Sequence, residues 1–182
     1  IGNHHFPSVE RARLAEELAR LTPGDLRYSV FTSGGSEAID VAIKSARHAT
    51  QRRKVVALAE GYHGRTGLSG AAGDDEAARY FLSDHPEEFV KVPGNDLAAM
   101  ERALAEGDVA AVVMETIPAT SGFPLPDAGY LPGVKALCDR QGTLYIADEV
   151  QTGLGRTGRL WGVETYGVQP DIITFAKGVT SG

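Results

Sequence analysis

The chain has 182 residues, a length suited to one domain with a substantial hydrophobic core. Its net charge of −6 and its scattered basic residues argue against a surface that binds nucleic acid or anionic membranes. Cys138 is the single cysteine, which excludes an intramolecular disulfide and favours a reducing, cytoplasmic location. The sequence shows neither an apolar run of membrane-spanning length nor a signal-peptide pattern.

Residues 1–7 (IGNHHFP) show no periodicity and are expected to form a polar loop. Its two adjacent histidines are poor metal ligands, because neighbouring side chains point apart and no third ligand lies at a suitable spacing. A helix is expected from Ser8, a good N-cap residue, because an apolar stripe of helical period continues from it to Leu21.

A strand, a Gly/Ser turn and a helix are expected next. Tyr28–Phe31 has strand character, and Glu37–Ala49 carries an apolar stripe typical of a helix. The turn between them, TSGGS at 32–36, could bind phosphate, because free N–H groups and the dipole at a helix N-terminus attract anions. Such turns also simply connect elements, and the spacing and lysine of a nucleotide P-loop are absent.

The segment Lys54–Ala59 reads as another strand and leads into GYHGRT at 61–66. Tyr62 and His63 thus offer a flat aromatic surface on a flexible loop, although a lone tyrosine more often packs on its own protein. Residues 67–89 have little sheet character and are expected to form loop and a short helix. A further helix is expected after Asn95 or Asp96 and is stopped by Gly107.

Three more strands are expected, each ending in a charged residue. They are Val109–Met114 before Glu115, Leu144–Ala147 before Asp148, and Ile172–Ala176 before Lys177, with a helix at Gly133–Arg140 between the first two. The first is wholly apolar, as in strands that a parallel sheet buries on both faces. Alternating strands and helices predict an α/β fold, a mostly parallel sheet with helices on both faces.

Asp148 and Lys177 make the strongest chemical pair in the sequence. Ligands of open α/β sheets collect outside the carboxyl ends of the strands, so these two side chains are expected to meet in one crevice. A buried amine is a nucleophile toward carbonyls, and a carboxylate can hold a pyridinium nitrogen protonated, as in pyridoxal phosphate chemistry. For either residue alone, a solvated loop charge is the simpler interpretation, so the hypothesis depends on agreement with the other segments.

Taken together, the segments resemble the class III (ω-type) aminotransferases, which are pyridoxal-phosphate enzymes of fold type I. The match runs nearly end to end, and DEVQTGLGRTG followed by PDIITFAKG is highly specific, whereas TSGGSEA and GYHGRT are individually modest. The resemblance implies a pyridoxal 5′-phosphate cofactor and an incomplete form of the large cofactor-binding domain. It also implies a homodimer with shared active sites for the longer protein.

The resemblance implies a role for each matched residue. Lys177 would form the Schiff base with the cofactor and then move a proton, and Asp148 would pair with the pyridine nitrogen. The other implied cofactor-site residues are Gly35 and Ser36 at the phosphate, Tyr62 and Val150 on the two ring faces, His63 beside Tyr62, Gln151 at the 3′-oxygen, and Glu115 near the substrate, where relatives often supply an arginine partner.

Two departures from the family pattern concern the substrate and the chain length. Thr116 stands where relatives usually have proline, and PATSGFP replaces a glycine-rich pattern, so the substrate class is less certain than the cofactor. Because relatives are much longer, we expect a fragment, with residues 1–27 leading into a partial large domain at 28–182 and the C-terminal small domain absent.

The predicted function is transfer of an amino group from an amine or ω-amino acid to a 2-oxo acid. One alternative is a decarboxylase or aminomutase of the same fold, and the glutamine of DEVQTG with the intact GLGRTG favours a transaminase over the aminomutase. The other alternative is a catalytically incomplete fragment. The amino donor and acceptor stay open.

Overall fold

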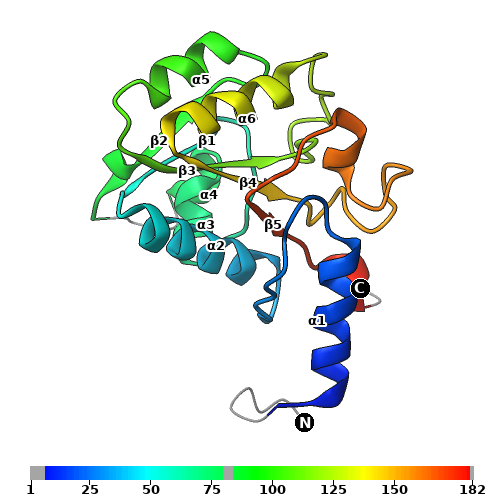
Figure 1. Cartoon of the computed structure of the whole chain (residues 1–182). Coiled ribbons are helices and arrows are strands. Elements are labelled where there is room, and N and C mark those ends of the chain that lie inside the picture. Colours follow the sequence, from blue (N-terminus) through cyan, green and yellow to red (C-terminus); the bar gives the residue numbers. More distant parts are fainter. Residues whose placement is uncertain (1–6, 80–83, 181–182) are drawn as a thin grey trace.

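The computed structural model describes residues 7–79 and 84–180, so the loop predicted at 1–7 lies almost wholly outside the described residues (Figure 1). Its centre is a five-stranded sheet in the order β2-β1-β3-β4-β5, and all four strand pairs are parallel. The strands are β1 (Lys54–Leu58), β2 (Phe89–Val92), β3 (Val109–Glu115), β4 (Leu144–Asp148) and β5 (Ile172–Thr174). The predicted parallel sheet is confirmed.

Helices cover both faces of the sheet, with α5 and α6 on one side and α2 on the other (Figure 1). No helix of the described residues is long and apolar enough to cross a membrane. The α-helices are α1 (Val9–Leu21), α2 (Gly35–Thr50), α3 (Gly67–Ala72), α4 (Asp75–Ala78), α5 (Leu97–Leu104) and α6 (Tyr130–Gln141), and the 3-10 helices are η1 (Pro86–Glu88), η2 (Gly162–Tyr166) and η3 (Lys177–Thr180).

The apolar strand β3 joins the two halves of the core. Val112 and Met114 pack into the cluster under α5 and α6, whereas Ala111 and Val113 pack into the cluster under α2. Successive side chains of a strand point to opposite faces, so a strand between two helical layers must be apolar at every position. All seven residues of β3 are accordingly buried.

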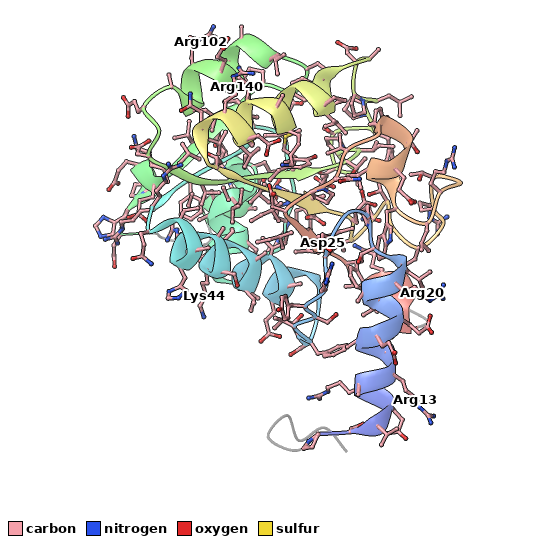
Figure 2. All side chains as sticks on the ribbon, in the orientation of Figure 1. Arg13, Arg20, Asp25, Lys44, Arg102 and Arg140 are labelled. Atoms are coloured by element: carbon pink, nitrogen blue, oxygen red, sulfur yellow. The ribbon has the colours of Figure 1, made fainter. Side chains whose placement is uncertain are left out.

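Two predicted helix starts are confirmed by their caps. The Ser8 hydroxyl accepts from the Arg11 N–H at 3.3 Å, and the Asp96 carboxylate accepts from the Ala99 N–H at 2.8 Å. Helix α1 extends away from the sheet and buries only Leu18 among its residues (Figure 1). The charged side chains labelled on the helices, Lys44 of α2 among them, point outward from the body (Figure 2).

The strand predicted at Tyr28–Phe31 is wrong. This segment pairs with none of the described strands, and Tyr28 is 99% exposed. Strand propensity favours an extended backbone, but a β-strand also needs a second strand to hydrogen-bond with. The sequence of one segment does not show whether such a strand lies beside it. Conversely, β2 was not predicted, because it is short and carries Lys91 on an edge where propensity counts for little.

Smaller differences concern element ends. Helix α6 begins at Tyr130 rather than at Gly133, and β5 ends at Thr174 rather than at Ala176. The part of residues 67–89 that the structure describes contains α3, α4 and η1 before β2, where loop and a short helix were expected.

Candidate active site

The predicted site residues lie at the carboxyl ends of the strands. In the sheet register Glu115 of β3 is opposite Asp148 of β4, and Asp148 is opposite Thr174 of β5. The loop that follows β1 brings Tyr62 to the same end, because its N–H donates to Oε1 of Glu115 at 2.9 Å. From β1 the chain passes to β2 on one side and then crosses back to β3 on the other side of β1. Such a reversal of strand order is a switch point, where ligands bind in open α/β sheets.

Asp148 is held by two donors. Its Oδ2 lies 2.8 Å from Nδ1 of His63, and its Oδ1 accepts from the Val150 N–H at 3.0 Å. Asp148 is 3% and His63 2% exposed, so water does not compete for the contact. A carboxylate only accepts hydrogen bonds, so Nδ1 carries the proton. The sequence predicts His63 beside the Tyr62 ring but does not predict its contact with Asp148.

The N-terminus of α2 lies against the segments that carry Val150 and Lys177. A Cβ built on Gly35 would lie 3.0 Å from Cγ2 of Val150 and 3.7 Å from Cβ of Ala176. The first N–H groups of a helix have no partner within it, so this turn presents free donors beside those residues. Glycine at 35 therefore lets three segments, distant in sequence, approach one point.

The loop carrying Tyr62 and His63 is fastened to the same helix. At Gly64, φ is +118° and an added Cβ would lie 2.0 Å from Oγ of Ser36, so only glycine allows this packing. The Asp40 carboxylate of α2 accepts from the Thr66 hydroxyl at 2.6 Å and from the Ser69 N–H at 2.7 Å. Asp40 was not predicted as a site residue, although its place one turn after Ser36 on the predicted helix was a usable signal.

Glu115 joins two loops in the structure. Oε1 accepts from the Tyr62 N–H, and Oε2 accepts from the Ala119 N–H at 3.1 Å. Burial is the main reason why the pKa of Glu115 lies above its usual value, and the two backbone N–H groups act against that rise. Beside it lies a pocket of about 100 Å³ that Thr116 and Tyr130 help to line. Both oxygens therefore have partners without an arginine.

Lys177 begins η3, three residues beyond Thr174, where the short strand β5 ends. Its side chain is exposed, as is that of Gln151, whereas the chemistry predicted from the sequence calls for a buried amine. Strand β5 is the outer strand of the described sheet, so no described strand covers its far side. Asp148 and Lys177 thus follow adjacent parallel strands at the same edge, as predicted, but the amine faces solvent.

Comparison with known proteins identifies the family. The model of the class-III aminotransferase family matches residues 2–182. This chain belongs to the class III aminotransferases. That result confirms the resemblance, and with it the family cofactor predicted from the sequence, pyridoxal phosphate.

Two curated relatives are aminotransferases. The chain is 53% identical over 182 residues to an uncharacterised aminotransferase of Archaeoglobus fulgidus, covering 100% of this chain and 42% of that protein. It is 40% identical over 181 residues to a putrescine aminotransferase of Pectobacterium atrosepticum, covering 94% of this chain and 38% of that protein. The chain therefore spans about two fifths of the length of these relatives.

Solved structures agree in fold. A transaminase from the marine bacterium Virgibacillus matches with a TM-score of 0.89 and 33% identity, covering 98% of this chain and 44% of that chain. A taurine:2-oxoglutarate aminotransferase from Bifidobacterium kashiwanohense, solved with pyridoxal phosphate and glutamate, matches with a TM-score of 0.87 and 34% identity. Coverage is 98% of this chain and 46% of that one. These structures confirm the α/β fold and show that the chain is part of it.

Proposed function

We propose that this chain forms the cofactor-binding part of an aminotransferase that moves an amino group from an amine or ω-amino acid to a 2-oxo acid. In this proposal residues 28–182 belong to the large domain and residues 1–27 lead into it. The observation that carries the proposal is the meeting of Gly35, Val150 and Ala176 next to the buried Asp148–His63 pair. Family membership supports amino-group transfer, and the site geometry supports the particular residues.

The residues present fit pyridoxal phosphate. An anionic phosphate suits the free N–H groups of Gly35 and Ser36 at the start of a 16-residue helix, where the dipole favours negative charge. A pyridine N–H suits the Asp148 carboxylate, whose oxygens have lone pairs beyond those used by His63 and Val150. The aldehyde suits a nearby amine, and Lys177 supplies one.

The protein's own groups then have distinct tasks. The His63 N–H orients the carboxylate of Asp148, and the side chains of Val150 and Tyr62 would pack on the two faces of the pyridine ring. Gln151 would donate to the 3′-oxygen. When bound, pyridoxal phosphate supplies the electron sink that allows a proton to leave the carbon bearing the amino group. Lys177 would hold the cofactor through its amine and would then carry that proton as general acid and base.

Replacing Lys177 tests the proposal. In the full-length protein Lys177→Ala should reduce transamination by more than about 10³-fold, because it removes both the covalent link and the proton carrier. The absorbance band that arises from the link between the lysine and the cofactor should disappear with it. Lys177→Arg is the matched control for charge, since a guanidinium stays protonated and does not condense with an aldehyde, and it should be equally inactive. Normal turnover by the alanine variant would refute the assignment.

A second candidate is that these residues alone are catalytically incomplete. The exposed Lys177 favours it, because a dry site is what lowers an amine's pKa and protects a reactive carbonyl adduct from water. The chain covers only 42% and 38% of the length of its two relatives, which also favours an incomplete site. We also propose that the longer protein is a homodimer, which would cover exposed apolar side chains such as Tyr28 and Val30.

A further inference from the structure

Glu149 is a buried acid that the proposed chemistry does not use. It follows Asp148 directly at the end of β4 and is 1% exposed. Burial raises the pKa of Glu149, whereas the hydrogen bonds to its carboxylate act in the opposite direction. A carboxyl group taken out of water needs donors to replace the lost water contacts. The hydrogen-bond donors to Glu149 therefore identify the segments that its side chain connects.

The donors come from segments on either side of the turn. Oε1 accepts from the hydroxyl of Thr116 and from the Val163 N–H, the latter at 2.9 Å. Oε2 accepts from the Gly162 N–H at 2.6 Å. A Cβ on Gly162 would lie 3.1 Å from Oε2 and 2.9 Å from Cβ of Thr152, so glycine permits this close approach. The carboxylate thus joins the start of η2 and the residue after β3 to the end of β4.

The backbone of Glu149 is fixed on the opposite side. Its N–H donates to the Thr174 carbonyl of β5 at 2.8 Å, and its carbonyl accepts from the Gly153 N–H at 2.9 Å. The turn carrying Asp148, Val150 and Gln151 is therefore held to β5 by the main chain. It is held to the segment after β3 by the buried hydroxyl of Thr116.

We propose that Thr116 is a positioning residue for the cofactor, acting through Glu149 on the turn that carries Asp148, Val150 and Gln151. The inference rests on the proposed cofactor function. Thr116 follows β3 and lines the small pocket next to Glu115, whereas the turn carries the residues that would contact the cofactor ring. The Thr116 hydroxyl adds a side-chain link between these two segments just beyond the β3–β4 ladder, which ends at Glu115 and Asp148. Without it the turn keeps its main-chain hydrogen bonds to β5 but loses this link to the residue after β3.

The test uses the full-length protein, first freed of cofactor and then titrated with pyridoxal phosphate. Thr116→Val keeps the shape but removes the hydroxyl, Thr116→Ser keeps the hydroxyl, and Thr120→Val is a control at an exposed threonine of the same loop. We expect the Thr116→Val variant to bind pyridoxal phosphate about tenfold more weakly, because a hydrogen bond to a charged group is lost. Its visible circular dichroism at saturating cofactor should also be weaker, while the serine and Thr120→Val variants match the wild type.

Each other result has a definite meaning. If Thr116→Val lowers the melting temperature of the cofactor-free protein but leaves affinity and circular dichroism unchanged, Thr116 is merely structural and the inference is wrong. Should that variant not fold, Thr116→Ala is measured in its place against the same two readouts. A wild-type protein that shows no absorbance change with pyridoxal phosphate would instead overturn the proposed function, and this inference with it.

Discussion

Each of the two carboxylate oxygens of Glu115 accepts a hydrogen bond from the backbone of a different loop. One accepts from the Tyr62 N–H and the other from the Ala119 N–H, so the site needs two acceptors. Glutamine has the same shape but only one acceptor oxygen, and its NH₂ group would face a backbone N–H. The usual exchange of glutamate for glutamine is therefore not conservative at this position.

We predict that Glu115→Gln destabilises the protein by about 1–3 kcal/mol, the cost of leaving a buried donor without an acceptor. Urea unfolding of the full-length protein measures it. Glu60→Gln, at an exposed glutamate after β1, should change the free energy of unfolding by less than about 0.5 kcal/mol. Equal stabilities of the two variants would mean that the backbone contacts of Glu115 contribute nothing.

The positions of Asp148 and Lys177 could be predicted from the sequence, but the direction of the His63 ring could not. The two former residues each follow an apolar strand, and parallel strands end at one edge of the sheet. His63 contacts an acid 85 positions away, and which residue its ring meets depends on how the loop packs on α2. Thr116 presented the same difficulty, because its departure from the family pattern was visible and its hydrogen bond to Glu149 was not.

At the scale of elements, helix α2 carries the proposed phosphate site and also anchors the loop after β1. Gly64 rests on Ser36, and Asp40 accepts hydrogen bonds from Thr66 and Ser69. The loop that presents Tyr62 is thus positioned by the same helix whose N-terminus would bind the phosphate. A change on the helix, away from any ligand, should therefore affect the ring site.

We predict that Asp40→Asn loosens this loop, because the amide offers one acceptor oxygen where the carboxylate uses two. Hydrogen exchange at residues 62–69 should become faster, and affinity for pyridoxal phosphate should fall about threefold to tenfold. Lys44→Gln is the control, since Lys44 lies on the outer side of the same helix (Figure 2). Unchanged exchange in the asparagine variant would show that Asp40 does not hold the loop.

The sequence predicted those helices and strands whose pattern lies within a single segment. It did not predict correctly where a strand depends on pairing with a second segment. The apolar run of β3 and the caps of α1 and α5 are local signals, and the structure contains all three. Residues 28–31 have strand propensity without a described partner, whereas β2 has a partner in β1 despite its weak pattern. Strand pairing is a property of two segments, so neither result could be read from one.

At the scale of the whole molecule, the described residues form a packed core on both faces of the sheet but leave apolar side chains exposed near the N-terminal helix. Both faces of the sheet are packed, whereas α1 and the segment after it expose Val9, Tyr28 and Val30. Exposed apolar groups of this kind mark surfaces that other parts of a protein cover. The core therefore favours folding of these 182 residues, and the exposed side chains favour poor function in isolation.

We predict that pyridoxal phosphate added to the isolated 182-residue chain gives neither a visible absorbance band nor thermal stabilisation. The full-length protein should show both, because binding to the folded state raises the melting temperature. Lys177→Ala in the isolated chain controls for adducts at other amines. A stoichiometric band that this substitution abolishes would mean that the described residues form a competent site on their own.

The outer position of β5 has a consequence for how the enzyme is assembled. Lys177 follows β5, a three-residue strand with no described strand on its far side, so the exposure of its amine to water depends on what lies against that edge in the longer protein. Assembly and reactivity are thereby coupled. If Lys177 acts as proposed, the described residues alone leave its amine in water, and the reaction would begin only once other parts of the longer protein cover that edge of the sheet.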